Sequence, residues 1–107
     1  MDVLTELGQR RAAQVADGIE AAAAADLYAA APAALAQKLG LQVAQQSGAT
    51  VLLAADLPSP MFNRVIGLGL HAPASAQDLE NVSARFRAAG VAAWWLHWNP
   101  FAAPADF

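Results

Sequence analysis

The segment from Phe62 to Pro73 holds the residues whose types and spacing come nearest to a known kind of chemistry. Within it, Arg64, Gly67 and Gly69 fit the pattern Arg-x-x-Gly-x-Gly. Glycines let a backbone approach an anion closely, and an arginine beside them adds positive charge, so the pattern could hold a pyrophosphate. Such a cradle also requires a helix that begins at the glycines and directs its amide groups at the anion.

Two observations favour a β-strand over a phosphate loop in this segment. The first residue expected to cap a helix is Ser75, well after Gly69, so the helix N-terminus would lie too far from the glycines. Apolar residues also alternate with the glycines, which is the two-residue period of a strand. We therefore expect a strand over 64–70, with Gly67 and Gly69 within it or at its end and holding no pyrophosphate.

Asn63 and Arg64 are a second candidate for chemistry, because adjacent amide and guanidinium groups can bind a carboxylate or a phosphate. The same two residues follow a loop that contains Pro58 and Pro60. A structural interpretation is open as well, and we favour it. In that interpretation Asn63 closes the proline-rich loop, and Arg64 pairs with an acidic residue at the surface.

The remaining polar side chains form no recognisable catalytic or metal-binding set. His71 and His97 have no acidic residue or cysteine at metal-ligand spacing, and a single strand histidine is more often a hydrogen-bonded structural residue. Tyr28, the only tyrosine, could act as a general acid, but packing is the favoured role. The sequence has no nucleophile triad, paired carboxylates or Walker loop, so we assign no catalytic, cofactor-binding or metal-binding residue.

Three tryptophans lie close together near the C-terminus, Trp94, Trp95 and Trp98. In a strand, Trp94 and Trp98 share a face with Leu96, whereas Trp95 lies on the opposite face. Both faces of this strand therefore need cover, and another chain could cover one of them. We treat the three tryptophans as candidates for an interface between subunits.

Composition places the chain among small globular domains. It has 107 residues, and 57% of them are hydrophobic, which is enough for a packed core. The formal net charge is −3 with no basic stripe, so nucleic acid is not an expected partner. The absence of cysteine excludes disulfides and thiolate metal sites. No apolar run is long enough to span a bilayer and the acidic N-terminus is unlike a secretory signal, which together favour a cytoplasmic protein.

Periodicity, caps and turns predict the elements that must position these residues. Residues 1–40 are expected to be helical, because alanine is abundant and larger apolar residues recur at helical spacing. Pro32 interrupts this segment, and Gly40 ends the shorter helix that follows. The recurring apolar residues are Leu4, Leu7, Val15, Ile19 and Leu27.

Residues 41–70 are expected to form three strands, and the first two make a hairpin around a Ser-Gly turn. A helix follows at 75–89, where Ser75 is the N-cap and an acidic residue stands three positions later. A fourth strand follows at 91–98. This order predicts one α+β domain over 1–107, with N-terminal helices and an antiparallel-rich mixed sheet of about four strands that contains one strand–helix–strand crossover.

An ordered set of short motifs runs from about Asp26 onward. It comprises Ala30-Ala31-Pro32 with Leu39-Gly40-Leu41, the run from Phe62 to Gly69, Pro73-Ala74-Ser75 before an amphipathic helix, Gly90, and Pro100-x-Ala102-x-Pro104. As a set, these motifs resemble the N-terminal half of bacterial two-half N-acetyltransferases of the GNAT superfamily. The resemblance covers most of the chain.

This resemblance implies a GNAT-like fold that is incomplete, because in such proteins the C-terminal half usually carries the acetyl-coenzyme A loop. It implies a relationship to N-acetyltransferases, with acetyl-coenzyme A as the family's cofactor, and a domain that is not catalytic on its own. The expected partner is then either a second copy, in a homodimer, or a C-terminal catalytic half that this chain lacks.

A non-enzymatic function is the alternative. Asn63, Arg64 and the tryptophan-rich strand could recognise a small ligand or a protein, or the last strand could serve only for assembly. The sequence leaves these hypotheses open and does not identify a substrate.

Overall fold

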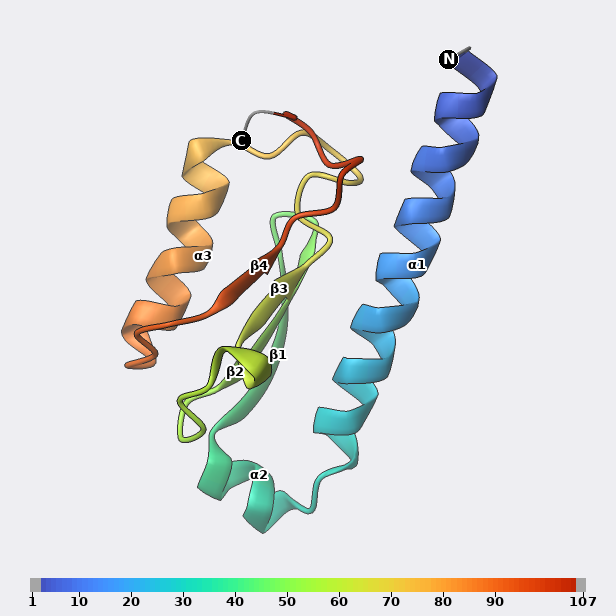
Figure 1. The fold of residues 1–107 in the computed structure, drawn as a ribbon. Coiled ribbons are helices and arrows are strands. Elements are labelled where there is room, and N and C mark those ends of the chain that lie inside the picture. Colours follow the sequence, from blue (N-terminus) through green and yellow to red (C-terminus); the bar gives the residue numbers. More distant parts are fainter. Residues whose placement is uncertain (1–2, 106–107) are drawn as a thin grey trace.

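Residues 3–105 are described by a computed structural model, in which a four-stranded sheet lies between helices α1 and α3 (Figure 1). In chain order the elements are α1 (Val3–Ala30), α2 (Ala33–Leu39), β1 (Leu41–Gln46), β2 (Ala49–Ala54), the 3-10 helix η1 (Pro60–Phe62), β3 (Arg64–Ile66), α3 (Ala76–Ala88) and β4 (Trp95–His97). The strand order is β1-β2-β3-β4; the first three are antiparallel, and β4 is parallel to β3. The predicted α+β class and the single crossover, through α3, are confirmed.

The N-terminal helical segment divides where the proline predicts. Helix α1 ends at Ala30, and Pro32 takes the cap position before α2 because its ring cannot continue a helix. Gly40 adopts a φ of 66°, so α2 ends in a left-handed residue as expected. The expected ends of the helical segment and of the domain, residues 1–2 and 106–107, lie outside the described residues.

None of the helices within 3–105 is by itself long and apolar enough to cross a membrane. Helices α1 and α2 reach that length and composition only when taken together, and the chain bends by 111° between them.

Strands β1 and β2 form a hairpin with a two-residue turn, as the Ser-Gly pair predicts. Ser47 and Gly48 both have positive φ, 56° and 76°, which is the conformation of tight turns that match the twist of the strands. All six residues of β2 are buried, because hydrophobic clusters cover both faces of this central strand.

The third strand is shorter than the sequence predicts. Strand β3 ends at Ile66 and not at residue 70, because Gly67 and Gly69 have φ values of 96° and 83°, which lie outside the strand conformation. The chain turns there, and the amide of Leu70 donates to the carbonyl of Gly67 at 3.2 Å. Gly67 therefore follows the strand directly, whereas the prediction of a strand at Gly69 is wrong.

Helix α3 begins with the expected capping box. The hydroxyl of Ser75 accepts a hydrogen bond from the amide of Asp78 at 3.1 Å, and the Asp78 carboxylate accepts one from the amide of Ser75 at 2.9 Å. The bond from the Ser75 amide, followed by that from the Ser75 side chain, holds the pKa of Asp78 below its ordinary value.

The C-terminal end of α3 explains why the fourth strand does not begin at Val91. Gly90 adopts a φ of 78°, and the amide of Val91 donates to the carbonyl of Phe86 at 2.9 Å, which closes the helix. Since Val91 belongs to this cap, the strand cannot begin there. Strand β4 covers only Trp95–His97, and the predicted strand 91–98 is wrong in its extent.

Two hydrophobic clusters occupy opposite faces of the sheet. On the α3 face the buried side chains include Val51, Leu53, Val65, Val82 and Phe86. On the α1 face they are Ala21, Tyr28, Leu52 and Ile66. The sheet is thus the middle one of three layers, and each cluster fixes one helix to it.

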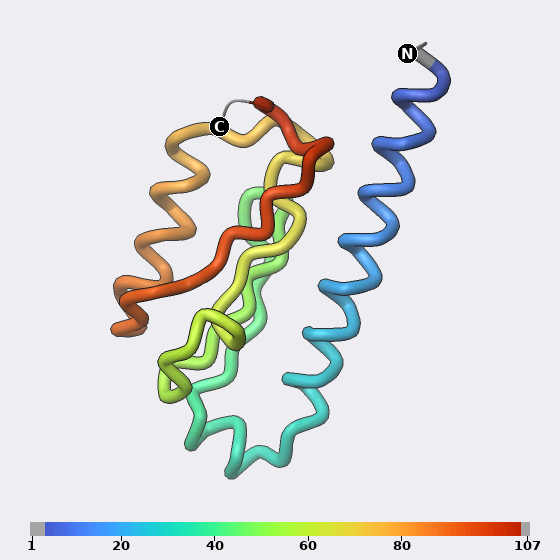
Figure 2. The backbone as a smooth tube through the Cα atoms, in the orientation of Figure 1, coloured from blue at the N-terminus to red at the C-terminus, as the bar shows by residue number. Residues whose placement is uncertain are grey.

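Helix α1 leaves its larger aliphatic residues exposed. Its buried residues are Ala13, Ala21 and Tyr28, and the helix extends past the sheet toward the N-terminus (Figure 2). The recurring apolar residues of the sequence are exposed instead, namely Leu4, Leu7, Val15, Ile19 and Leu27. A helical pattern was correctly predicted, but the face that meets the sheet is made mainly of alanine.

Candidate functional site

Asn63 is fully buried and holds the loop between β2 and β3. Its side-chain oxygen accepts a hydrogen bond from the amide of Ala54 at 2.7 Å. Its side-chain nitrogen donates to the carbonyls of Leu57 and Ser59 at 2.9 and 3.0 Å. Both hydrogens of this amide are used within the chain, so the side chain closes the proline-rich loop and has no donor left for a ligand.

Arg64 lies on the α1 face of the sheet, because it pairs with Leu52 of the α1-side cluster. Its Nη1 atom is 3.3 Å from Oε1 of Glu20 on α1. The Nε atom of Arg64 is buried and has no hydrogen-bond partner among residues 3–105. The guanidinium thus pairs with an acidic residue, as expected, while its buried Nε donor stays unused within residues 3–105.

A cavity of about 380 Å³ lies beside this ion pair, between α1 and the η1–β3 segment. The charged pair shares its wall with apolar side chains, which include Ala24, Leu27, Met61 and Phe62. Tyr28 also lines the cavity, and its hydroxyl donates to the carbonyl of Phe62. Burial raises the pKa of Tyr28, against the opposing effect of the Arg64 charge, so this hydroxyl stays a structural donor at neutral pH.

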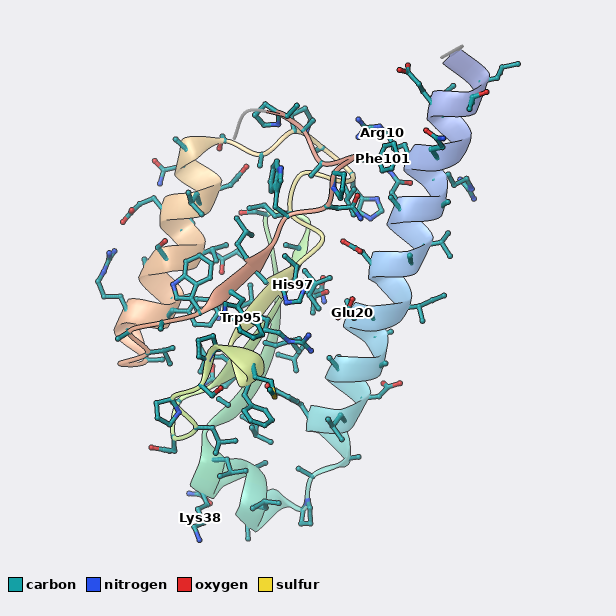
Figure 3. The ribbon with its side chains drawn as sticks, viewed as in Figure 1. Arg10, Glu20, Lys38, Trp95, His97 and Phe101 are labelled. Carbon is teal, nitrogen blue, oxygen red and sulfur yellow. The ribbon has the colours of Figure 1, made fainter. Side chains whose placement is uncertain are left out.

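Strand β4 adds an indole and an imidazole to the same face of the sheet. Trp95 is paired with Arg64, and His97 stands two residues further on, so all three side chains project from the α1 face. Figure 3 shows Trp95 and His97 along β4 and Glu20 on α1. Trp95 is 49% exposed, whereas Nε2 of His97 is buried and has no hydrogen-bond partner in the described part of the chain. Two buried nitrogens without partners therefore belong to neighbouring strands.

The glycine segment after β3 is covered by the C-terminal part of the same chain. A Cβ atom at Gly69 would lie 2.7 Å from the carbonyl oxygen of Ala103 and 2.9 Å from Cη2 of Trp98. The amide of Ala103 also donates to the carbonyl of Gly69 at 2.9 Å. Where the β3–α3 connection ends, the carboxylate of Asp78 occupies the N-terminus of α3. Protein atoms thus fill the space beside Gly69, and an acidic group takes the place an anion would use.

The three tryptophans differ in exposure. Trp94 stacks on Phe86 of α3 with ring centroids 4.8 Å apart and an angle of 7° between the planes. Trp98 is partly buried against the clusters that contain Leu68 and Ala102. Trp95 is exposed, whereas Trp94 and Trp98 are half-buried, so Trp95 offers the most accessible indole of the three to a ligand or another chain.

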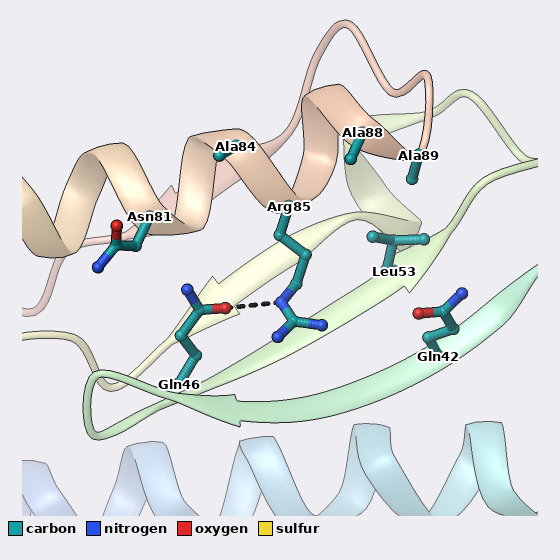
Figure 4. Close-up of a pocket in the computed structure, with 8 residues that line it drawn as sticks. All are labelled: Gln42, Gln46, Leu53, Asn81, Ala84, Arg85, Ala88 and Ala89. Carbon is teal, nitrogen blue, oxygen red and sulfur yellow. Dashed lines mark hydrogen bonds between the residues drawn. The ribbon is translucent and has the colours of Figure 1, made fainter.

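A larger hollow of about 510 Å³ lies on the opposite side of the sheet, between β1, β2 and α3 (Figure 4). Its main polar contact joins Nε of Arg85 to Oε1 of Gln46 at 2.6 Å. Neither of the two buried unpartnered nitrogens found within 3–105 belongs to its lining. We therefore place the candidate site on the α1 face, around Arg64 and His97.

Neither a metal site nor a comparison with known proteins assigns a function to further residues of this chain. Within the described range no three His, Asp or Glu side chains gather where they could hold a metal ion, and His71 is exposed in the β3–α3 connection. No protein-family model, curated protein or solved structure matches this chain.

The sequence alone did not bring the members of this site together. Arg64 was expected to meet an acidic residue, but Glu20 lies 44 positions away and gives no local signal. The sequence gives no sign that Tyr28 and His97 lie on the same face of the sheet as Arg64. The parallel register of β3 and β4 pairs Trp95 with Arg64 and His97 with Ile66, and so puts His97 on the same face as Arg64, two residues along. This register depends on the crossover geometry and not on spacing in the sequence.

Proposed function

We propose that this chain is a GNAT-related domain that binds a small carboxylate on its α1 face and is not catalytic on its own. The observation that carries this proposal is the pair of buried nitrogens that have no hydrogen-bond partner among residues 3–105, Nε of Arg64 and Nε2 of His97. Buried polar groups in folded proteins are nearly always hydrogen-bonded, so an acceptor supplied from outside the chain accounts for Nε of Arg64. The same acceptor suits Nε2 of His97 in the tautomer that carries its proton on that nitrogen. A carboxylate has two acceptor oxygens and suits an arginine donor.

The surroundings of Arg64 define the class of carboxylate further. Glu20 already engages Nη1, so the ligand is expected to use Nε and to leave the ion pair in place. The adjoining cavity is walled by Leu27 and Phe62, which favours a short apolar chain beside the carboxylate. Trp95 is exposed next to Arg64 in the sheet and offers a further apolar surface.

The GNAT relationship rests on the sequence resemblance, and the arrangement of elements supports it. Two helices, three antiparallel strands and a crossover helix to a parallel strand agree with the incomplete GNAT-like fold that the resemblance implies. Fold alone does not define activity, however. The packing of Ala103 against Gly69 supports a domain without a pyrophosphate loop, because the space that the cofactor would need is filled.

Binding is tested by titrating the full chain with acetate and butyrate while the side-chain resonances of arginine Nε–H and histidine are followed by NMR. We expect the Arg64 and His97 signals to shift together and to saturate, with a dissociation constant on the order of 1 mM for butyrate. Acetate should bind more weakly, because its methyl group buries less apolar surface than a propyl chain.

Arg64→Lys keeps the positive charge but removes the Nε donor, and it is expected to weaken butyrate binding about tenfold. Arg87→Lys is the matched control, since Arg87 also pairs with a glutamate, Glu80 at 2.9 Å, but is exposed on α3. That control should bind butyrate as the unaltered chain does. An equal loss of butyrate affinity in both variants would show that the effect is not specific to the Nε donor of Arg64, and it would overturn the proposed site.

Acetyl-coenzyme A is titrated separately, because its binding would support the enzymatic half-domain instead. Saturable shifts of backbone signals from Gly67 to Asp78 would contradict the proposal that this segment holds no pyrophosphate. No saturable shift at Arg64 or His97 with any carboxylate would overturn the ligand-binding function.

A further inference from the structure

Helix α1 carries an apolar face that nothing in the described part of the chain covers. Its larger aliphatic side chains are each more than half exposed, with exposed fractions of 81% for Leu4, 57% for Leu7, 53% for Val15 and 66% for Ile19. They recur at the intervals of one helix face. This outer face of α1, from Leu4 to Asp26, is about 33 Å long at the usual helical rise. An apolar stripe of this length marks a surface on which another element packs.

Two glycines lie along the outer face, and the rest of the chain gives no reason for them. A Cβ atom at Gly8 or Gly18 would meet nothing within 4 Å. Glycine inside a helix lowers helix stability relative to alanine, so the stability of α1 itself does not account for the two glycines either. A second helix would supply one, because positions without a side chain let two helix axes approach to about 8 Å.

Two exposed charges stand on this side of the helix, one toward each end. Arg11 and Asp26 are exposed, and neither takes part in any ion pair found within residues 3–105. The 15 positions between them are about four helical turns, so both side chains point to nearly the same side. A partner for this face must therefore offer an acid near Arg11 and a base near Asp26.

We propose that the outer face of α1 binds a second copy of this chain, with the two α1 helices antiparallel. A twofold axis midway between Arg11 and Asp26, at Gly18 and Ile19, places Arg11 of each copy beside Asp26 of the other, and Val15 opposite Ala22. Opposite charges then meet twice, and the helix dipoles run in opposite directions. A parallel pair would instead place Arg11 against Arg11 and Asp26 against Asp26.

A second copy suits this face better than a lipid surface does. Acidic residues outnumber basic ones along α1, with Glu6, Asp17, Glu20 and Asp26 against Arg10 and Arg11. Helices that lie on membranes carry lysine and arginine on their polar face, which attract anionic headgroups. The proposal is also independent of the carboxylate site, because Arg64 lies between α1 and the sheet, on the other side of the helix.

Sedimentation equilibrium of the full chain measures the dissociation constant of the dimer. Arg11→Glu and Asp26→Arg, made singly, bring like charges together and are expected to raise that constant about tenfold or more. The double variant restores opposite charges in both pairs and should return the constant to within about threefold of the original. Lys38→Glu is the matched control for Arg11→Glu, since it makes the same change in charge at an exposed position of α2.

The orientation is tested with introduced cysteines, because the chain has none of its own. Val15→Cys combined with Ala22→Cys should give disulfide-linked dimers on mild oxidation, since these positions face each other in the antiparallel register. Val15→Cys alone should not, because its two copies would lie about 10 Å apart along the helix, which exceeds the reach of a disulfide.

A chain that stays monomeric at every concentration overturns the proposal. So does a dimer whose dissociation constant is the same in the charge variants, or one that is linked efficiently by Val15→Cys alone. Binding to phosphatidylserine vesicles without dimerisation would assign the outer face to a lipid surface instead.

Discussion

Asn63 shows at the scale of single residues how one buried amide can organise a loop. Its side chain joins Ala54 at the end of β2 to Leu57 and Ser59 in the loop that leads to η1. A buried polar group that loses its partners costs free energy, so Asn63 also disfavours every loop conformation that would leave its amide unpaired.

Asn63→Ala is expected to lower the free energy of unfolding by about 2 to 4 kcal/mol, because it removes all three hydrogen bonds in a buried site. Urea denaturation measures the loss. Asn81→Ala is the control, since Asn81 is exposed on α3 and bonds only to the side chain of Gln77. It should change the free energy of unfolding by less than about 0.5 kcal/mol. Similar losses in the two variants would contradict the role given to Asn63.

The sequence predicted that Asn63 closes a loop and that Arg64 forms an ion pair, because a proline-rich loop and a strand start are local patterns. The partners could not be predicted. Glu20 reaches Arg64 only because α1 lies across the sheet, and His97 joins them only through the parallel pairing of β3 and β4. Contacts of this kind depend on how elements pack and leave no trace in sequence spacing.

Among the elements, the β3–α3 connection departs most from its sequence pattern. The alternation of apolar residues and glycines predicted a longer strand, yet the two glycines adopt positive φ and turn the chain. They do so for different reasons. Gly67 has only a carbonyl oxygen of Gly48 near its missing Cβ, at 3.9 Å, whereas Gly69 is pressed by Ala103 and Trp98.

Gly67→Ala and Gly69→Ala form a matched pair, since both place a side chain at positive φ. Gly67→Ala is expected to cost about 1 kcal/mol of folding stability, from backbone strain alone. Gly69→Ala should cost about 3 kcal/mol or more, because its Cβ also collides with Ala103. Thermal or urea unfolding compares the two. Equal losses would mean that the C-terminal segment does not pack on Gly69.

The capping box of α3 was predicted correctly because its two residues are close in sequence, and it makes stability depend on pH. The pKa of Asp78 in the folded protein is held below its ordinary value of 3.8. Its stabilising effect is therefore complete above that value and is lost as the pH falls through the lowered pKa.

The stability difference between the unaltered chain and Asp78→Asn should therefore be constant near neutral pH and shrink below about pH 3.8. Urea midpoints of both proteins across this range measure it, and other carboxylates cancel in the comparison. A difference that persists unchanged into strong acid would show that the charge of Asp78 is not what caps the helix.

At the scale of the whole molecule, α1 sets the shape. The radius of gyration over Cα atoms is 14.7 Å, compared with about 13 Å for a compact chain of this length. The longest dimension is 51 Å, and the others are 27 and 18 Å. The helix is attached to the sheet chiefly through Ala13, Ala21 and Tyr28, so much of its length stands on the surface.

The orientation of α1 is the part of the fold that sequence reasoning described least well. Its helical pattern was clear, but spacing alone cannot say which of two apolar faces meets the sheet. Alanines pack closely on β2 and β3, and Tyr28 adds a hydrogen bond to Phe62. The larger residues, Ile19 among them, are left for the outer face, where a second copy would bury them.

The contact between α1 and residues 99–102 joins segments that are synthesised at different times. Ala13 packs with Ala102, and Asp17 of α1 accepts a hydrogen bond from Asn99, 82 residues later. At cellular rates of synthesis this separation corresponds to roughly 4 to 16 seconds. Until residues 99–102 have been synthesised, α1 lacks these contacts, and part of its sheet-facing side stays uncovered. Helix α1 is thus anchored in part by residues that are synthesised long after its own.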